Sequence, residues 1–194
     1  MKNKNILIGI TGGIAAYKIL TLISMLVKNG YSVKTILTEN ALNFITPLTA
    51  QTLSNNEVFV SQFPATVNFS PEHIALADWA DIFIIAPATA NTIAKLANGI
   101  ADNLLTSVFL AFKKDIIIAP AMNTNMLNNP ATQKNLESLK ARENIILLST
   151  AEGYLACGKS GVGRMQEPEI LFKLIELTLF HRNIFNSLLN KKVL

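Results

Sequence analysis

Two stretches of polar side chains, each directly after an apolar run, carry residue types suited to binding a ligand. Residues 120–130 follow the apolar run 115–119 and contain four asparagines and one threonine. Residues 87–92 follow the run 82–86 and contain two threonines and one asparagine. Hydroxyl and amide groups donate and accept hydrogen bonds, and in open α/β sheets ligands bind beyond the carboxyl ends of the strands. Both stretches are therefore predicted to form part of a site, with a plain Pro/Asn turn as the alternative for residues 120–130.

A glycine turn near the N-terminus offers a third contact of this kind. Residues 11–13 separate the apolar run 5–10 from an amphipathic pattern that begins at Ile14 and ends at Asn29-Gly30. Glycine lets the backbone approach an anion, and the free N–H groups and dipole at the start of a helix attract the anion. The arrangement is typical of phosphate-binding turns, although many α/β proteins begin in the same way.

The sequence favours a mononucleotide over a dinucleotide at this turn. The dinucleotide fingerprint G-x-G-x-x-G is absent from residues 10–16. The predicted strand 32–37 ends before Thr38, where an NAD enzyme usually has Asp or Glu, and Glu39 follows directly. FMN therefore fits the pattern better than NAD, and the Thr38 hydroxyl is able to donate a hydrogen bond to it.

Two further segments carry side chains that could act on a bound ligand. Residues 153–165 contain four glycines, Cys157 and Arg164, which favours a flap over a site; a surface loop with an incidental cysteine is the alternative. His73 lies near the start of a predicted helix over 71–81, where the helix dipole favours a neutral imidazole. A surface histidine that caps the helix is the alternative there.

The elements that must position these residues alternate between strands and helices. Strands are predicted at 5–10, 32–37, 82–86, 115–119 and 144–148, with a weaker candidate at 57–60. Helices are predicted from Ile14 to Asn29, over 71–81, after 100–105, over 131–142 and from 167 to about Thr178. This alternation predicts an α/β fold with a doubly wound parallel sheet, flavodoxin/Rossmann-like, as a FMN-binding domain.

Composition narrows the classes of function. Half of the 194 residues are apolar and 15% are charged, which suits one globular domain with a large core. The net charge of +4 comes without a basic stripe, so no nucleic-acid partner is expected. The single cysteine excludes an internal disulfide and a cysteine-based zinc cluster, and no metal is predicted. No apolar run reaches the roughly 18 residues of a membrane span, so we expect no membrane and a cytoplasmic protein.

Six motifs in order give the chain a close resemblance to the flavin-dependent cysteine decarboxylases, and within them to the phosphopantothenoylcysteine decarboxylases of coenzyme A synthesis. The resemblance spans about residues 5 to 175. The motifs are Gly12–Lys18, His73-Ile74, Pro87–Thr92, Ala101–Leu105, Pro120–Met126, and Ala156-Cys157-Gly158 together with Gly163-Arg164-Met165.

This resemblance implies a set of site residues and FMN as the cofactor. The implied cofactor contacts are Gly12, Gly13, Ile14, Ala15, Thr38, Phe44, Ala88, Thr89, Asn91, Thr92 and Met122. The implied substrate contacts are Ala121, Asn123, Met126 and, as a candidate for the substrate phosphate, Arg164; Lys95 of a neighbouring subunit is the other candidate. His73, Asn123 and Cys157 are the implied catalytic residues, with His73 at the flavin, Asn123 on the substrate carboxylate and Cys157 as the proton donor.

The resemblance also implies the reaction and the assembly. The cysteine moiety of 4'-phosphopantothenoylcysteine is oxidised by FMN and loses carbon dioxide, and the product is then protonated and reduced again, so no net redox change occurs. A thioaldehyde formed by the oxidation accepts the electrons that decarboxylation leaves behind. A neutral amide holds the carboxylate without stabilising it as strongly as a cation would. The family implies a homotrimer or a dodecamer, with each site at a subunit interface.

In bacteria this decarboxylase is commonly fused to phosphopantothenate-cysteine ligase. Residues 190–194 resemble the beginning of that ligase half, so we predict a decarboxylase domain over 1–178 and a C-terminal tail over 179–194 that is the linker and start of a missing domain. Three alternatives stay open: a decarboxylase of a peptide's C-terminal cysteine, a non-catalytic flavin- or nucleotide-binding regulatory module, and an NAD-binding domain. The Asn123 and Cys157 motifs argue against a flavin prenyltransferase.

Overall fold

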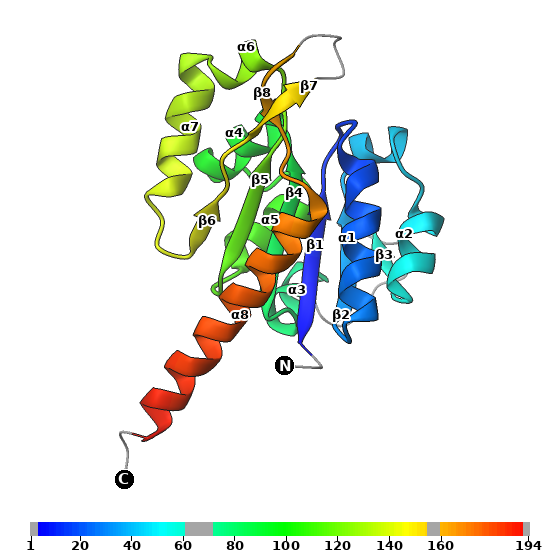
Figure 1. The fold of residues 1–194 in the computed structure, drawn as a ribbon, viewed down its shortest axis with the longest axis vertical. Helices are drawn as coiled ribbons and strands as arrows, with labels where there is room; N and C mark the ends of the chain where they lie inside the picture. Colours follow the sequence, from blue (N-terminus) through cyan, green and yellow to red (C-terminus); the bar gives the residue numbers. More distant parts are fainter. Residues whose placement is uncertain (1–3, 61–71, 155–159, 192–194) are drawn as a thin grey trace.

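The computed structural model describes residues 4–60, 72–154 and 160–191, and its centre is a parallel sheet of six strands (Figure 1). The strand order is β3-β2-β1-β4-β5-β6, and every neighbouring pair is parallel. The strands are β1 (Asn5–Ile10), β2 (Ser32–Leu37), β3 (Val58–Phe59), β4 (Ile82–Ala88), β5 (Ile116–Pro120) and β6 (Ile145–Leu147). The chain winds outward from β1 in one direction and from β4 in the other, which is the Rossmann order. The predicted doubly wound sheet is confirmed.

Helices cover both faces of the sheet. One face carries α1 (Ala16–Lys28) and α8 (Pro168–Lys191), which lie in front in Figure 1 and pack on each other. The opposite face carries α3 (Glu72–Trp79), α4 (Ala90–Asn98), α5 (Leu104–Ala111) and α7 (Pro130–Lys140). The remaining elements are η1 (Glu39–Asn43), α2 (Pro47–Ser54), α6 (Thr124–Leu127) and the antiparallel hairpin of β7 (Ala151–Tyr154) and β8 (Ser160–Arg164). Among the described residues, no helix is long and apolar enough to span a bilayer.

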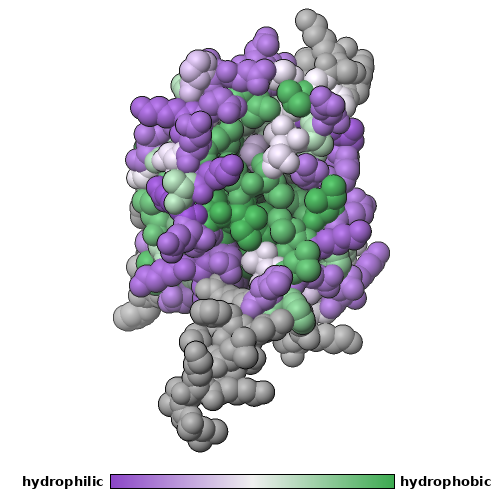
Figure 2. Space-filling view, turned by 60° about the vertical axis from the view of Figure 1, so that its left-hand side comes forward, coloured by the Kyte–Doolittle hydropathy of each residue, from purple (hydrophilic) through white to green (hydrophobic). Residues whose placement is uncertain are grey.

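The cover over one face is incomplete on the side where α7, β6 and α8 lie. Figure 2 shows a broad apolar patch on this side of the molecule, ringed by polar side chains. Apolar side chains that are only partly buried against the core include Ile146 and Leu148 at β6 and Phe172 and Leu174 on α8. An apolar patch ringed by polar residues often marks a surface that binds another protein.

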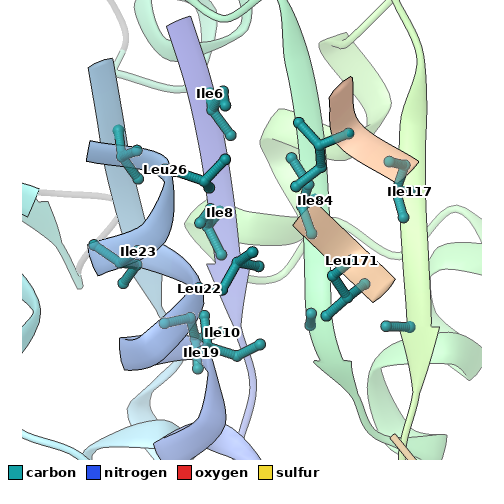
Figure 3. Close-up of a cluster of buried hydrophobic side chains, with 14 of the residues drawn as sticks. Ile6, Ile8, Ile10, Ile19, Leu22, Ile23, Leu26, Ile84, Ile117 and Leu171 are labelled. Carbon is teal, nitrogen blue, oxygen red and sulfur yellow. The ribbon is translucent and has the colours of Figure 1, made fainter. Parts of the chain in front are cut away.

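Branched aliphatic side chains fill the space between the sheet and α1. Ile6, Ile8 and Ile10 point from β1 toward Ile19, Leu22, Ile23 and Leu26 of α1, and Ile84, Ile117 and Leu171 continue the cluster across the sheet (Figure 3). All of these side chains have no exposed surface. Burial of one such side chain contributes about 1.5–3 kcal/mol, so this layer fixes the position of the residues that follow β1.

Local structure departs from the sequence-based expectations at a few elements. The glycine-rich segment was predicted to be a flap over a site, without regular structure being assigned to it; its described part pairs as the β7–β8 hairpin, and its role as a flap stays a prediction. The short helix α6 within the asparagine stretch was not predicted. The last helix was predicted to end near Thr178, which is wrong, because α8 continues to Lys191. The division into a domain over 1–178 and a tail over 179–194 stays a prediction.

Candidate functional site

A cavity of about 1130 Å³ lies beyond the carboxyl ends of β1 and β4, where the strand order reverses. Open α/β sheets bind their ligands at this switch point. The structure brings thirteen of the predicted site residues to the cavity wall. They are Gly12, Gly13, Ile14, Ala15, Thr38, Thr89, Asn91, Thr92, Ala121, Met122, Asn123, Met126 and Arg164.

The glycine turn after β1 packs so closely on η1 that there is no room for a side chain at Gly12. A Cβ at Gly12 would lie 2.5 Å from Cβ of Asn40 and 2.9 Å from its carbonyl oxygen. At Gly13 the nearest atom to a Cβ would be Cγ2 of Thr89, at 3.6 Å. Gly12 is therefore required for the close approach of the turn, and the start of α1 lies at the cavity wall with no acidic residue in its first turn.

Thr11 joins the glycine turn to the end of β4. Its hydroxyl donates to the carbonyl oxygen of Pro87 at 2.5 Å and accepts from the backbone N–H of Thr89 at 3.2 Å. Thr89 in turn caps α4, because its Oγ1 accepts from the backbone N–H of Thr92 at 3.4 Å. Two polar segments 78 positions apart in sequence are thus held at one edge of the cavity. The role of Thr11 has one sequence signal, a threonine directly before two glycines.

The asparagine stretch after β5 is clamped to strand β8 of the hairpin. The backbone N–H of Met122 donates to the carbonyl oxygen of Gly163 at 2.9 Å, and the Thr124 hydroxyl donates to the carbonyl oxygen of Val162 at 2.7 Å. Asn123 is the N-cap of α6, and its Oδ1 accepts from the backbone N–H of Asn125 at 2.8 Å. The cap fixes the orientation of the Asn123 amide at the cavity wall.

Two groups of ion pairs lie at the cavity wall. Lys18 of α1 donates to both carboxylate oxygens of Glu167, at 2.8 and 2.9 Å, and Arg164 donates to one of them at 2.6 Å. The hydrogen bond from Lys18 lowers the pKa of Glu167 against the opposing effect of burial. Lys95 donates to Asp102 at 2.5 Å, and this hydrogen bond is the main cause of the lowered pKa of the Asp102 carboxyl. The pair of Lys18 and Glu167 has no local sequence signal, because the two residues are 149 positions apart, whereas Lys95 and Asp102 are only seven positions apart.

Four predicted site residues are not among those that line this cavity. Ala88 is buried in β4 and its carbonyl oxygen accepts from the N–H of Ala121, while Phe44 is exposed beside η1. His73 lies in the first turn of α3, away from the cavity wall. Cys157 is outside the described residues. Their assigned roles stay predictions.

A parallel Rossmann-order sheet with a glycine turn and a large cavity at its switch point defines a nucleotide- or cofactor-binding α/β protein. The model of the Flavoprotein family matches residues 1–179. The chain therefore belongs to the Flavoprotein family.

Within this family the chain is similar to proteins of coenzyme A biosynthesis. The chain is 48% identical over 176 residues to the coenzyme A biosynthesis bifunctional protein CoaBC of Bacillus subtilis (strain 168), covering 91% of this chain and 43% of that one. It is 43% identical over 179 residues to a Streptococcus mutans serotype c protein named "Probable phosphopantothenoylcysteine decarboxylase", covering 89% and 97%. The chain thus spans less than half the length of the bifunctional relative and nearly all of the shorter one.

Two solved structures have a similar fold, and one of them is a complex with a ligand. A PPC decarboxylase mutant complexed with pantothenoylaminoethenethiol superposes with a TM-score of 0.80 at 32% identity, over 91% of this chain and 98% of that one. The FMN binding protein AtHal3 superposes with a TM-score of 0.77 at 34% identity, over 90% and 95%. The predicted family and fold class are confirmed.

Proposed function

We propose that the chain binds FMN in the cavity at the switch point and decarboxylates the cysteine end of 4'-phosphopantothenoylcysteine, giving 4'-phosphopantetheine. One observation carries the proposal: the glycine turn, the Thr89–Thr92 junction and the Asn123 stretch, which are far apart in sequence, line one cavity. Relatives similar over nearly the whole of this chain bear the names of this reaction and of its FMN cofactor.

The residues at the cavity wall suit a phosphate-bearing cofactor. Gly12 is packed against Asn40 with no space for a side chain, so the backbone itself forms the wall beside the start of α1. Backbone N–H groups and the dipole at a helix start favour a phosphate there. Thr38, Thr89 and Thr92 add hydroxyl groups to the same wall, and they would hold the rest of the cofactor.

Bound FMN supplies a two-electron acceptor for the cysteine moiety, which allows carbon dioxide to leave. Asn123 binds the substrate carboxylate through a neutral amide, and its orientation is set by the hydrogen bond that Oδ1 accepts from Asn125. A neutral donor binds the carboxylate without the strong ground-state stabilisation that a cation would add. Cys157 donates the proton to the decarboxylated product, because a thiol with a reference pKa of about 8.5 is protonated at neutral pH. The two electrons that the cofactor would have accepted return to that product, which gives 4'-phosphopantetheine with no net redox change.

The same proposal includes a homotrimer or a dodecamer with each site at a subunit interface. Three large hydrophobic side chains that line the cavity are about half exposed in a single copy, namely Ile14, Tyr17 and Met126. His73 is not among the residues that line its own cavity, and in this proposal the His73 of a second copy completes the site. The apolar patch in Figure 2 offers another surface for contacts between copies.

We further propose that the chain works with, or is fused to, phosphopantothenate-cysteine ligase in the cytoplasm. The substrate contains an amide between cysteine and a phosphorylated acid, so a ligase reaction must supply it. The CoaBC relatives are named as bifunctional, and their length beyond the match is enough for a second domain.

Incubation of purified protein with 4'-phosphopantothenoylcysteine tests the proposal, with release of carbon dioxide and formation of 4'-phosphopantetheine as the measurements. A peptide ending in cysteine and NADH are the comparison ligands. Turnover of the peptide alone would replace the substrate, whereas colourless protein that binds NADH would overturn the assignment of FMN. The Cys157→Ser variant is expected to release carbon dioxide without forming 4'-phosphopantetheine, and normal turnover by it would exclude Cys157 from the reaction.

A further inference from the structure

The ion-pair cluster of Lys18, Arg164 and Glu167 places two cations and one anion at the cavity wall. Glu167 accepts three hydrogen bonds from these two side chains. The Lys18 side chain is only 11% exposed, whereas those of Arg164 and Glu167 are 40% and 42% exposed. Lys18 and Arg164 line the cavity, while Glu167 is the residue that joins them. The cluster therefore leaves one net positive charge at this wall.

The backbone holds both ends of this cluster in place. Glu167 lies at the start of α8, where its carbonyl oxygen accepts from the N–H groups of Ile170 at 3.0 Å and Leu171 at 3.2 Å. Arg164 ends β8 and passes over Gly153 of β7, because a Cβ at Gly153 would lie 3.0 Å from Nη1 and 3.4 Å from Cδ of Arg164. The guanidinium is thus confined between the hairpin on one side and the Glu167 carboxylate on the other.

The two ion pairs of Glu167, one with Arg164 and one with Lys18, have different effects. A pair between two partly exposed side chains such as Arg164 and Glu167 adds little to stability. Its effect on the position of the guanidinium is larger, because an arginine held in one orientation loses little entropy when it binds an anion. The pair of Glu167 with Lys18 is different, because loss of the carboxylate would leave a nearly buried ammonium group without its partner.

We propose that Glu167 is a positioning residue that holds Arg164 at the cavity wall to bind the phosphate group of the substrate. A guanidinium has five N–H donors in a planar fork, so Arg164 can donate to Glu167 and to a phosphate together. Arginine binds phosphate with two parallel hydrogen bonds. The inference rests on the proposed function, because that function supplies a ligand with a phosphate at the end remote from the cysteine.

Binding of two related products tests the inference without turnover. Isothermal titration calorimetry of the flavin-loaded protein measures Kd for 4'-phosphopantetheine and for pantetheine, which lacks the phosphate. Arg164→Gln is expected to weaken binding of 4'-phosphopantetheine about 10–100-fold, the range for a hydrogen bond to a charged group, and to leave pantetheine within about twofold. Glu167→Gln is expected to reduce the preference for the phosphate about 3–10-fold, because the guanidinium loses its fixed position.

Glu152→Gln is the matched control, because Glu152 is an exposed carboxylate on β7 outside the cavity and its loss changes the net charge equally. It is expected to keep the parent's preference. Should Glu167→Gln fail to fold, the double variant Lys18→Met/Glu167→Gln removes the buried ammonium group as well and replaces it in the comparison.

Equal weakening of both ligands by Glu167→Gln would overturn the positioning role, as would an unchanged ratio of the two Kd values. A parent protein that binds both products equally tightly would show that the phosphate is not recognised, and the inference would fail while the proposed function stands. A parent that binds neither product would instead contradict the proposed function.

Discussion

The backbone N–H of Met122 donates to the carbonyl oxygen of Gly163, and the two residues lie so close that a Cβ on Gly163 would overlap the carbonyl oxygen of Met122. Gly163 has a φ of +130°, a conformation that favours glycine. This contact joins the stretch that carries Asn123 to the hairpin that carries Arg164. The two sides of the cavity are therefore one unit, and a change in the hairpin is expected to displace the residues that we propose as substrate contacts.

Replacement of Gly163 by alanine is expected to lower both stability and activity. The positive φ costs about 1–3 kcal/mol for a residue with a side chain, and the added methyl group must also push Met122 away. Gly99→Ala is the matched control, because Gly99 has a φ of +69° with no heavy atom within 4 Å of a Cβ. Thermal unfolding is expected to show a larger loss for Gly163→Ala than for Gly99→Ala, and only Gly163→Ala should lose decarboxylation. Equal losses for the two variants would show that the contact with Met122 contributes nothing.

Much of the fold was predictable because most strands of the parallel sheet are apolar runs. The predicted bounds of β1 and β2 match the structure to the residue. The hairpin of β7 and β8 was missed because its glycines are typical of irregular loops, and α8 was predicted too short because the residues after Thr178 match no motif.

The residues of the candidate site were predictable from sequence only where they directly follow a predicted strand. The glycine turn, the Thr89–Thr92 junction and Asn123 each follow a strand end, and that position alone brings them together. The pairing of Lys18 with Glu167 joins residues 149 positions apart. No local pattern indicates such a pair, so only the packing of α1 against the start of α8 reveals it.

Replacement of Thr35 by valine is expected to stabilise the fold. Thr35 is fully buried in β2, and its Oγ1 has no hydrogen-bond partner within the described part of the chain. A buried hydroxyl without a partner costs about 1–3 kcal/mol, and valine has nearly the same shape. Chemical denaturation should give an increase of about 1 kcal/mol in the free energy of unfolding.

Thr106→Val is the matched control for this prediction. Thr106 is equally buried, but its Oγ1 donates to the carbonyl oxygen of Asn103 at 3.0 Å and accepts from the N–H of Asn103 at 3.2 Å. This variant breaks the cap of α5 and is expected to lose about 1 kcal/mol. If Thr35→Val is destabilised to the same degree, the hydroxyl of Thr35 has a partner and the premise is wrong.

The ion pair of Lys95 and Asp102 is expected to make stability depend on pH below about 4. The hydrogen bond from Lys95 lowers the pKa of Asp102 in the folded state below 3.8. A carboxyl group with a lowered pKa stabilises the fold above its unfolded pKa, and this contribution disappears as the pH falls through the folded pKa. Asp102→Asn should therefore show a smaller drop in Tm between pH 7 and pH 3 than the parent.

Lys95→Met tests the same ion pair through the drop in Tm between pH 7 and pH 3. It removes the donor instead of the carboxyl group, so the pH dependence should flatten in the same direction as for Asp102→Asn. The double variant should add little to either single change, because both act on one pair. Independent and additive effects would assign the pH dependence to other groups.

The proposed role of Asn123 gives the sharpest test of the site, because aspartate can keep its structural role while reversing its chemistry. Oδ1 of Asn123 caps α6 by accepting from the backbone N–H of Asn125, and aspartate caps a helix equally well. The amide N–H₂ group is replaced by a carboxylate oxygen, which would repel the substrate carboxylate. Asn123→Asp is therefore expected to keep the Tm within a few degrees and to lose at least about 100-fold in kcat/KM, about 2.7 kcal/mol of transition-state binding.

Asn129→Asp makes the same chemical change at the N-cap of α7, where Oδ1 accepts from the N–H of Ala131 outside the cavity, and it should retain full activity. Full activity in Asn123→Asp would refute the assignment of Asn123 to the substrate carboxylate.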